Sequence, residues 1–292
     1  MRWWNDFAEA MSHDAPLGRL TRFRLGGRAR YMFRPRSAEQ LSAMVVRAKH
    51  EGISVKVLGA GANVLVTDDG FDGVVVRLDQ PAFMEVDRDG VTATVGAGVE
   101  LMPFALKCCT MGYAGLEAMA GIPSSIGGAV KMNAGGRHGE FGQVVREISV
   151  LRSDGAVEDW PRERVGFGYR NSCVDTEIVL SVRVDLGEDD PTKLKSRFYE
   201  HFAAKNKSQP LKGDSAGCIF KNPEGKSAGA LIDQAGLKGT RRGQAVVSTR
   251  HANFILAEEG ATASDVLELI EVVREGVLQT FNTALELEVE IW

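Results

Sequence analysis

The chain has 292 residues, of which 44% are hydrophobic and 25% are charged, and its formal net charge at pH 7 is −4. It contains 33 Gly but only 9 Pro, without a three-residue period, which excludes collagen-like and Pro-rich disordered chains. The mildly acidic balance argues against a dedicated binder of nucleic acid or of anionic membranes, and the length is sufficient for two domains.

The first 190 residues are predicted to form an α+β domain with two lobes, at about 1–80 and 81–190. A helix is expected to begin at the capping box Ser37-x-x-Gln40 and to stop at Gly52. Strands are predicted at 53–58, 64–67, 74–78, 91–95 and 177–186, with a hairpin over 148–160 that turns at Ser153-Asp154-Gly155. A short helix over 100–111 is closed by Gly112.

The second region begins with a helix at Asp189-Asp190-Pro191, where acidic residues and a proline favour helix initiation. This helix is expected to end near Asn206, and a hinge is expected at 210–214. Residues 205–282 are predicted to form a smaller α+β domain with strands near Cys218 and at 253–257, and with helices at 227–235 and from Thr262 onward. An alternating strand over 285–291 lies in the last segment, 283–292.

Several functions are disfavoured by what the sequence lacks. No apolar run reaches the roughly 18 residues of a membrane helix, and the first residues have no signal-peptide core, so we expect a cytoplasmic protein. The 4 Cys form no C-x-x-C pair and are expected to be reduced thiols. The 5 His are scattered, so we expect no metal centre.

Two glycine segments are the strongest candidates for ligand loops. Gly59-Ala-Gly61-Ala-Asn63-Val64 lacks the third Gly of a dinucleotide fingerprint and is followed by β-branched residues, and a lone G-x-G is more often a tight strand connection. The second segment, 112–142, holds nine Gly in 31 residues. Glycine allows close approach of the backbone to a ligand, so the two loops could enclose one large anionic cofactor.

Five motifs in order carry a resemblance to a known family. They are Val57-Leu-Gly-Ala-Gly-Ala-Asn-Val-Leu65, the segment from Ala120 to Gly135, Phe167-Gly-Tyr-Arg-Asn-Ser172, Ser215-Ala-Gly-Cys-Ile-Phe-Lys-Asn-Pro223 and Leu285-Glu-Leu-Glu-Val289. Together they resemble the UDP-N-acetylenolpyruvoylglucosamine reductases, flavoenzymes of peptidoglycan precursor synthesis. Because Cys218 follows Arg170 by only 48 positions, the chain resembles the short, type II form.

The resemblance implies a p-cresol methylhydroxylase/vanillyl-alcohol oxidase-type FAD-binding domain over 1–190, a substrate-binding domain over 205–282 and a C-terminal strand over 283–292 with a catalytic carboxylate. It implies non-covalent FAD, with NADPH as co-substrate and a UDP-sugar enolpyruvyl ether as substrate. Neither nucleic acid nor a membrane is an expected partner, and the sequence leaves the oligomeric state open, with a monomer compatible. The implied FAD-binding residues are Gly59, Ala60, Gly61, Ala62, Asn63, Val64, Gly121, Ile122, Pro123, Ser124, Ser125, Gly127, Gly128, Asn133 and Ala134.

Three residues match the family's catalytic positions. Arg170 could bind the substrate carboxylate and stabilise the enolate, although an Arg beside Tyr169 could also simply stack at the surface. Glu288 matches the carboxyl group that helps to stabilise the enol intermediate, but alternation alone would place it with Glu286 and Glu290 on one solvated face.

Cys218 stands where the family pattern usually has the Ser that donates a proton to C2. A thiol with a pKa of about 8.5 is mostly protonated near pH 7 and can deliver that proton. Two alternatives stay open: Cys218 is only a small buried residue, or it is the nucleophile of a Cys218–His251 hydrolase, for which nothing local speaks.

The resemblance also implies substrate contacts from Tyr169, Lys221 and Asn222, with Lys205 and Lys207 as further sources of positive charge. Two positions depart from the family pattern: Ser124 replaces a common Gly, and Thr240 replaces a frequent aromatic residue. Two alternative functions remain: another FAD-dependent oxidoreductase of the same fold acting on an alcohol or sugar, and a flavin-binding module without catalysis.

Overall fold

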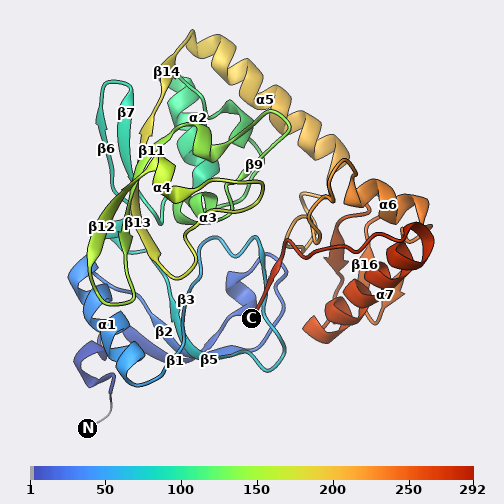
Figure 1. Cartoon of the computed structure of the whole chain (residues 1–292), viewed down its shortest axis with the longest axis horizontal. Coiled ribbons are helices and arrows are strands. Elements are labelled where there is room, and N and C mark those ends of the chain that lie inside the picture. Colours follow the sequence, from blue (N-terminus) through green and yellow to red (C-terminus); the bar gives the residue numbers. More distant parts are fainter. Residues whose placement is uncertain (1–2) are drawn as a thin grey trace. The chain divides into compact units, whose positions relative to one another are not determined.

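A computed structural model describes residues 3–292 and divides them into two compact units (Figure 1). The first unit comprises the described residues up to Asp14, Arg30–Ala60 and Asp72–Ala204, and the second comprises Ala15–Ala29, Gly61–Phe71 and Lys205–Trp292. Both units are therefore discontinuous in sequence. The predicted domains, 1–190, 205–282 and 283–292, were defined by what each part binds. They stay predictions, because the two compact units follow different boundaries.

A four-stranded sheet with the order β1-β2-β5-β3 lies mostly in the first unit. Its strands are β1 (Met11–Pro16), β2 (Arg28–Phe33), β3 (Val55–Val57) and β5 (Phe71–Val76), and β3 pairs with β5 in parallel. The predicted helix forms as α1 (Ala38–His50), because Ser37 accepts a hydrogen bond from the Gln40 N–H at its first turn. Strands β1 and β2 were not predicted, and β1 gives no pattern in the sequence because it is mostly exposed and has no apolar alternation.

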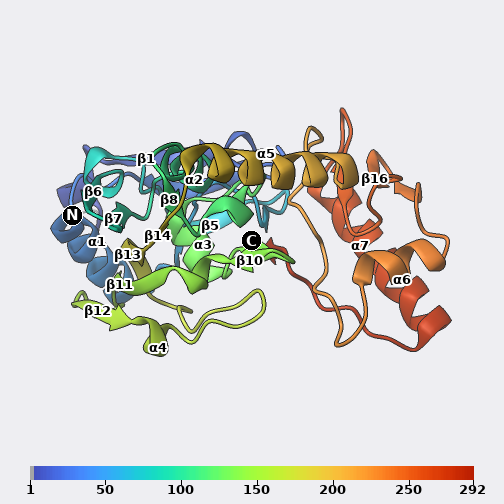
Figure 2. The ribbon, with the colours of Figure 1, turned by 90° about the horizontal axis from the view of Figure 1, so that it is seen from above.

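A five-stranded antiparallel sheet with the order β12-β11-β13-β7-β6 forms the rest of the first core. Its strands are β6 (Val86–Asp89), β7 (Thr92–Gly96), β11 (Val145–Leu151), β12 (Val157–Pro161) and β13 (Ile178–Asp185). The predicted hairpin and the predicted strand at 177–186 are confirmed. Helix α3 (Ile126–Lys131) packs against β13 and β7 (Figure 2), and it was not predicted because two successive Gly in its first turn disfavour helix formation.

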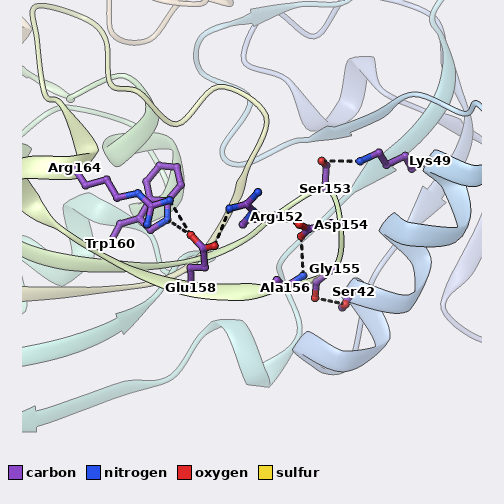
Figure 3. Close-up of polar contacts among 10 residues, drawn as sticks. All are labelled: Ser42, Lys49, Arg152, Ser153, Asp154, Gly155, Ala156, Glu158, Trp160 and Arg164. Carbon is purple, nitrogen blue, oxygen red and sulfur yellow. Dashed lines mark hydrogen bonds and ion pairs between the residues drawn. The ribbon is translucent and has the colours of Figure 1, made fainter.

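The turn of the β11–β12 hairpin contacts α1, as Figure 3 shows. Ser42 Oγ donates to the Gly155 carbonyl at 2.8 Å, and Lys49 Nζ donates to Ser153 Oγ at 3.1 Å. A Cβ on Gly155 would lie 2.6 Å from Val46 Cγ2, so glycine permits this close approach. These contacts join the two predicted lobes within the first unit.

A small polar cluster lies near the turn end of the same hairpin. Glu158 accepts hydrogen bonds from Trp160 Nε1 at 2.9 Å and from Arg152 and Arg164, each at 2.8 Å. The Trp160 hydrogen bond, followed by those from the two arginines, lowers the pKa of Glu158 to about 2. Because the side chains of both ion pairs are partly exposed to solvent, the pairs contribute little to the stability of the fold.

The remaining elements of the first unit are short, apart from helices α2 and α5. They are α2 (Leu101–Thr110), β8 (Tyr113–Ala114), β9 (Gly135–Gly136), β10 (Gly139–Glu140), α4 (Arg162–Val165) and β14 (Gly187–Glu188). Helix α5 (Pro191–Ser208) is continuous (Figure 2) and carries the chain from the first unit into the second, as the division falls at residues 204 and 205. The predicted helices at 100–111 and from Pro191 are confirmed, and the hinge at 210–214 stays a prediction.

The second unit packs two helices on a three-stranded antiparallel sheet with the order β15-β16-β17. Its elements are β4 (Val64–Leu65), α6 (Ala228–Gln234), β15 (Arg241–Arg242), β16 (Ala245–Val247), β17 (Ile255–Ala257), α7 (Ala263–Phe281) and β18 (Glu290–Ile291). Phe23 and Leu65, from the early segments, are buried in the same core as Val266 and Ile270 of α7. The two predicted helices, at 227–235 and from Thr262, are confirmed.

Two predicted strands of the second unit are wrong. Cys218 lies in an irregular segment, which is joined to the C-terminal segment by a single bridge between Phe220 and Leu287. The expected strand over 285–291 is regular only at β18, which pairs in parallel with β4. The predicted strand over 64–67 likewise reduces to β4. The physical reason is that backbone groups here bond to side chains and loops: Phe220 N–H donates to Asn253 Oδ1 at 3.0 Å.

Candidate active site

The two glycine segments meet in the first unit at Gly59 and Ser125. A Cβ on Gly59 would lie 2.4 Å from Ser125 Oγ, which is shorter than real contacts allow. Ser125 is fixed because its Oγ accepts the Gly128 N–H at 3.3 Å and caps α3. Only glycine at position 59 permits this approach, so the two glycine segments, which the sequence predicts to hold one cofactor, lie in direct contact within the first unit.

The glycines of α3 serve packing within the protein. Gly127 N–H donates to the Ala97 carbonyl at 2.9 Å, and a Cβ on Gly127 would lie 3.1 Å from Ala97 Cβ. The N–H groups of Gly127 and Gly128 are thus used inside the protein. The preceding predicted FAD-binding residues, Gly121, Ile122, Pro123 and Ser124, lie in the irregular segment before α3, and Ala134 follows the helix.

Arg77 was missed by the sequence analysis and lies against the first glycine segment. Its Nη1 donates to the Gly59 carbonyl at 2.8 Å, and its Nε lies 3.6 Å from Asp79 Oδ2. Burial lowers the pKa of Arg77, and the nearby Asp79 carboxylate opposes that shift. The only sign of this role in the sequence is that Arg77, a cation, directly follows the apolar run of β5. Arg77 fixes the carbonyl of Gly59 and so shapes the turn at Gly59-Ala60.

The second half of the first glycine segment belongs to the second unit. Gly61 has φ 63°, and a Cβ there would lie 2.3 Å from the Leu20 carbonyl oxygen. Ala62 and Asn63 follow it, and Val64 begins β4. Asn63 Nδ2 donates to the Glu288 carbonyl at 2.9 Å, and the Asn63 carbonyl accepts from Glu290 N–H at 3.0 Å. The predicted cofactor loop is thus bonded to the backbone of the predicted catalytic carboxylate.

Arg170 lies in the first unit at the tip of a tight turn. Gly168 and Asn171 exchange backbone hydrogen bonds at 3.0 and 3.3 Å, and Arg170 has φ 53°, a left-handed value that is uncommon outside glycine. Its Nη2 donates to the Gly135 carbonyl at 2.9 Å, and its Cζ lies 5.4 Å from the centre of the exposed Tyr169 ring. Arg170 therefore stacks on Tyr169 and is also held by the loop after α3.

Cys218 and Glu288 are brought together in the second unit. Glu288 N–H donates to the carbonyl of Ile219, the residue after Cys218, at 2.8 Å. On the other side of the bridge, Lys221 N–H donates to the Glu286 carbonyl at 2.9 Å. The two chain segments that carry Cys218 and Glu288, two of the three predicted catalytic residues, are thus hydrogen-bonded to each other. Cys218 is half-buried and no disulfide engages it.

Asn253 is a second residue that sequence reasoning missed. It is buried, its Oδ1 accepts Phe220 N–H and its Nδ2 donates to the Phe220 carbonyl at 2.8 Å, while its carbonyl accepts Ile219 N–H at 2.9 Å. This amide replaces a strand neighbour and fixes the Cys218 segment. Its sequence signal was only a polar residue in an otherwise apolar run.

His251, named above only as the partner of Cys218 in a possible hydrolase, takes part in local packing and backbone hydrogen bonding. Its Nδ1 accepts Asn253 N–H at 3.3 Å, and its ring lies 5.0 Å from that of Phe254. Burial, and secondarily the charge of Lys238, lowers its pKa. The imidazole therefore shapes the turn that carries Asn253.

The predicted substrate-binding residues Lys221 and Asn222 lie beside this site. Lys221 Nζ is 3.8 Å from the carboxylate of Glu286, which is 79% exposed. Asn222 Oδ1 accepts Ala228 N–H at 2.9 Å at the start of α6, so its oxygen is used by the protein. Lys205 and Lys207 lie in the last turn of α5.

The three glutamates of the C-terminal segment have different surroundings. Glu286 is exposed, Glu288 is half-buried and Glu290 accepts from Trp292 Nε1 at 3.3 Å. The expectation of one solvated face is therefore wrong, because the segment is not a regular strand.

Across residues 3–292, no group of three His, Cys, Asp or Glu side chains is arranged to hold a metal ion. Within the same range, no helix has both the length and the apolar composition needed to cross a bilayer.

Comparison with known proteins identifies the class of the fold and then the family. Residues 29–160 match the model of an FAD-binding domain, and residues 209–292 match that of a UDP-N-acetylenolpyruvoylglucosamine reductase C-terminal domain. A glucose dehydrogenase, Phl p 4.0202, shares the fold over 63% of this chain, with a TM-score of 0.50 and 15% identity. The chain is an FAD-binding oxidoreductase with a mixed α and β fold.

The relatives are more specific than the fold. The chain is 40% identical over 95% of its length to UDP-N-acetylenolpyruvoylglucosamine reductase 2 of Symbiobacterium thermophilum, covering 90% of that protein. It is 40% identical over 98% of its length to the reductase of Heliobacterium modesticaldum, covering 92% of it. The crystal structure of the Thermus caldophilus reductase matches with a TM-score of 0.84 and 39% identity over 95% of this chain and 97% of that one. The chain therefore belongs to the UDP-N-acetylenolpyruvoylglucosamine reductase family.

Proposed function

We propose that the protein is a short, type II enzyme that reduces UDP-N-acetylglucosamine enolpyruvate to UDP-N-acetylmuramate with NADPH, in the cytoplasm, for peptidoglycan precursor synthesis. The observation that carries the proposal is the pairing of the Cys218 segment with Glu288 inside the unit that matches the reductase C-terminal domain. A protein that only bound flavin would not need a thiol and a carboxylate in this arrangement.

The predicted FAD-binding residues would hold the cofactor in one shared site, and the contact between the two glycine loops at Gly59 and Ser125 supports this placement. When bound there, FAD would take a hydride from NADPH and supply it to C3 of the enolpyruvyl group. The FAD is held without a covalent bond, and one site serves NADPH and the sugar nucleotide in turn.

The protein's own residues would manage the charge that develops. Arg170 would bind the substrate carboxylate, where negative charge grows as an enolate forms, and Glu288 would help to stabilise the enol form. The Cys218 Sγ–H would give its proton to C2, leaving a thiolate that solvent reprotonates. Tyr169, Lys221 and Asn222 would contact the sugar nucleotide, the amide of Asn222 through its nitrogen.

A two-stage assay tests this function. Purified protein should be yellow, its flavin should be bleached by NADPH without air, and the colour should return when the enolpyruvyl sugar nucleotide is added. UDP-N-acetylglucosamine, which has no enolpyruvyl group, is the matched control and should leave the flavin reduced. Recovery of colour only with oxygen, together with oxidation of an alcohol or sugar, would assign the chain to another flavin oxidoreductase instead.

A further inference from the structure

Asn133 is a buried polar residue at the end of α3, only 2% exposed. Its Nδ2 donates to Glu140 Oε2 at 2.8 Å and to the Gly168 carbonyl at 3.0 Å, and its Oδ1 accepts Gly142 N–H at 3.0 Å. A primary amide has two donor hydrogens, so both donors of Asn133 are used inside the protein, and its oxygen accepts one hydrogen bond there. This argues against the expectation that its side chain binds FAD.

The bond to Gly168 connects Asn133 to the turn that carries Arg170. Gly168 begins that turn, and Ser172, which is also buried, fixes its other end by donating from Oγ to the Lys131 carbonyl at 3.1 Å. Arg170 Nη2 reaches back to the carbonyl of Gly135, two residues after Asn133. The turn is thus held at both ends and at its tip by the last residues of α3 and the loop that follows.

The backbone at this junction is fixed in unusual conformations. Asn133 has φ 40° and Arg170 has φ 53°, and such left-handed values persist outside glycine only where the surroundings determine them. Gly142 is constrained by packing instead, because a Cβ there would lie 2.6 Å from Phe167 Cγ and 2.9 Å from Asn133 Oδ1. The three segments are therefore packed around the Asn133 amide.

We propose that Asn133 is a positioning residue that sets the conformation of the Arg170 turn and so places the Arg170 guanidinium. This inference rests on the proposed function, in which Arg170 binds the substrate carboxylate. Asn133 itself touches neither substrate nor cofactor with its amide.

Half-reaction kinetics of Asn133→Ala and Asn133→Asp test the inference. The Asp variant keeps the size and the acceptor, but it loses both donor hydrogens and brings a carboxylate against Glu140. We expect reoxidation of the reduced flavin by the enolpyruvyl sugar nucleotide to slow by about 10²-fold in both, as a misplaced catalytic group does. The dissociation constant of FAD, from flavin fluorescence, should stay within about twofold of wild type.

A double-mutant cycle shows whether the effect passes through Arg170. Asn133→Ala in the Arg170→Ala background should slow reoxidation by no more than about twofold, because the group it positions is already absent. Independent, multiplying losses would overturn the inference. So would a large loss of FAD affinity with an unchanged reoxidation rate, which would make Asn133 a cofactor ligand.

Two controls separate misfolding and failure of the proposed function from failure of the inference. Asn282 at the end of α7 is exposed and has φ 48°, so Asn282→Ala imposes the same backbone change elsewhere and should leave both half-reactions unchanged. Arginine side-chain NMR, with the Arg170 Nε signal assigned through Arg170→Lys, needs no substrate. That signal should shift and broaden in Asn133→Ala and not in Asn282→Ala, and an unchanged signal would overturn the inference even if the wild-type protein reduced a different substrate.

Discussion

The backbone next to Cys218 is held firmly, because Ile219 N–H donates a hydrogen bond to the Asn253 carbonyl and the Ile219 carbonyl accepts one from Glu288 N–H. We therefore expect Cys218→Ala to fold normally and to keep flavin reduction by NADPH. Reoxidation by the enolpyruvyl substrate should slow by about 10²- to 10⁴-fold, the usual range for a lost general acid. Stopped-flow absorbance of the flavin measures both steps.

Cys218→Ser is the matched variant, because a hydroxyl also carries a transferable proton. It should recover much of the rate that Cys218→Ala loses. Equal reoxidation rates in the wild type and both variants would remove Cys218 from the mechanism.

The cysteines should also differ sharply in reactivity. Cys108 and Cys109 are buried in α2, and burial raises their pKa values to about 12 and about 11, respectively. Cys173 is exposed and Cys218 is half-buried. Since the thiolate is the reactive form, native protein at pH 8 should label at Cys173 and Cys218, and denatured protein at all four.

Mass spectrometry of iodoacetamide-labelled peptides reads this out. Cys173→Ser should leave Cys218 as the one rapidly labelled site among the remaining three cysteines, and the sugar nucleotide should slow that labelling. Rapid native labelling of Cys108 or Cys109 would contradict the burial of α2.

At the level of single residues, the position of a residue in a family motif predicted the candidate site better than the alternation of polar and apolar residues did. Cys218 and Glu288 were selected by their motifs, and the structure makes their segments neighbours. Arg77 and Asn253 could not be selected, because their roles depend on backbone groups brought near by folding. Alternation misled for the glutamates, since it assumes a regular strand.

The first turn of helix α7 donates hydrogen bonds to a carboxylate from another part of the chain. Asp68 accepts hydrogen bonds from Ala263 N–H at 2.9 Å and from Ser264 N–H and Oγ at 3.0 and 2.7 Å. Partial burial raises the pKa of Asp68, but these three hydrogen bonds outweigh it, so the pKa lies below its ordinary value. The ionised carboxylate therefore stabilises the folded state.

Asp68→Asn should lower the free energy of unfolding by about 1 kcal/mol at pH 7, the usual value of a helix cap. Because the folded pKa is depressed, this stabilisation is complete above the unfolded pKa of about 3.9 and is lost as pH falls through the folded pKa. Urea unfolding from pH 7 down to pH 3 should show the two curves converging.

Asp69→Asn is the control, since Asp69 is the adjacent exposed carboxylate. It should leave the stability close to wild type at every pH. A constant difference between wild type and Asp68→Asn down to pH 3 would show that the charge of Asp68 is not what matters.

Elements with local signals were predicted well. Helices α1 and α7 each begin at a residue whose side chain accepts the expected capping hydrogen bond, and α5 begins at its proline. Helix α3 and the segment around Cys218 were not predicted correctly. The first contains two glycines against Ala97 and Ser125, and the second depends on Asn253, so both are determined by tertiary contacts.

For the whole molecule, the second unit depends on residues from the start of the chain. Its core includes Phe23 and Leu65, and its C-terminal strand β18 pairs with β4. A fragment of residues 205–292 lacks these groups and Asp68. We expect it to be largely unfolded, with poorly dispersed amide signals in NMR, although it contains the whole matched C-terminal domain, residues 209–292.

Co-expression with residues 1–204 supplies the missing segments and should restore a soluble complex. The matched control is residues 1–204 alone. A fragment of 205–292 that folds cooperatively without its complement would contradict the discontinuous division.

The pairing of β4 with β18 also has a consequence on the ribosome. Leu65 and Val66 are fully buried in the folded protein, yet β4 and the segment after it take their backbone partners from residues 290–292, which are synthesised about 225 residues later (290 − 65). At translation rates of about 5–20 residues per second, this apolar stretch of the nascent chain waits on the order of ten seconds for its partner. Slowing translation after residue 71 should lengthen this wait and increase aggregation of the newly made protein.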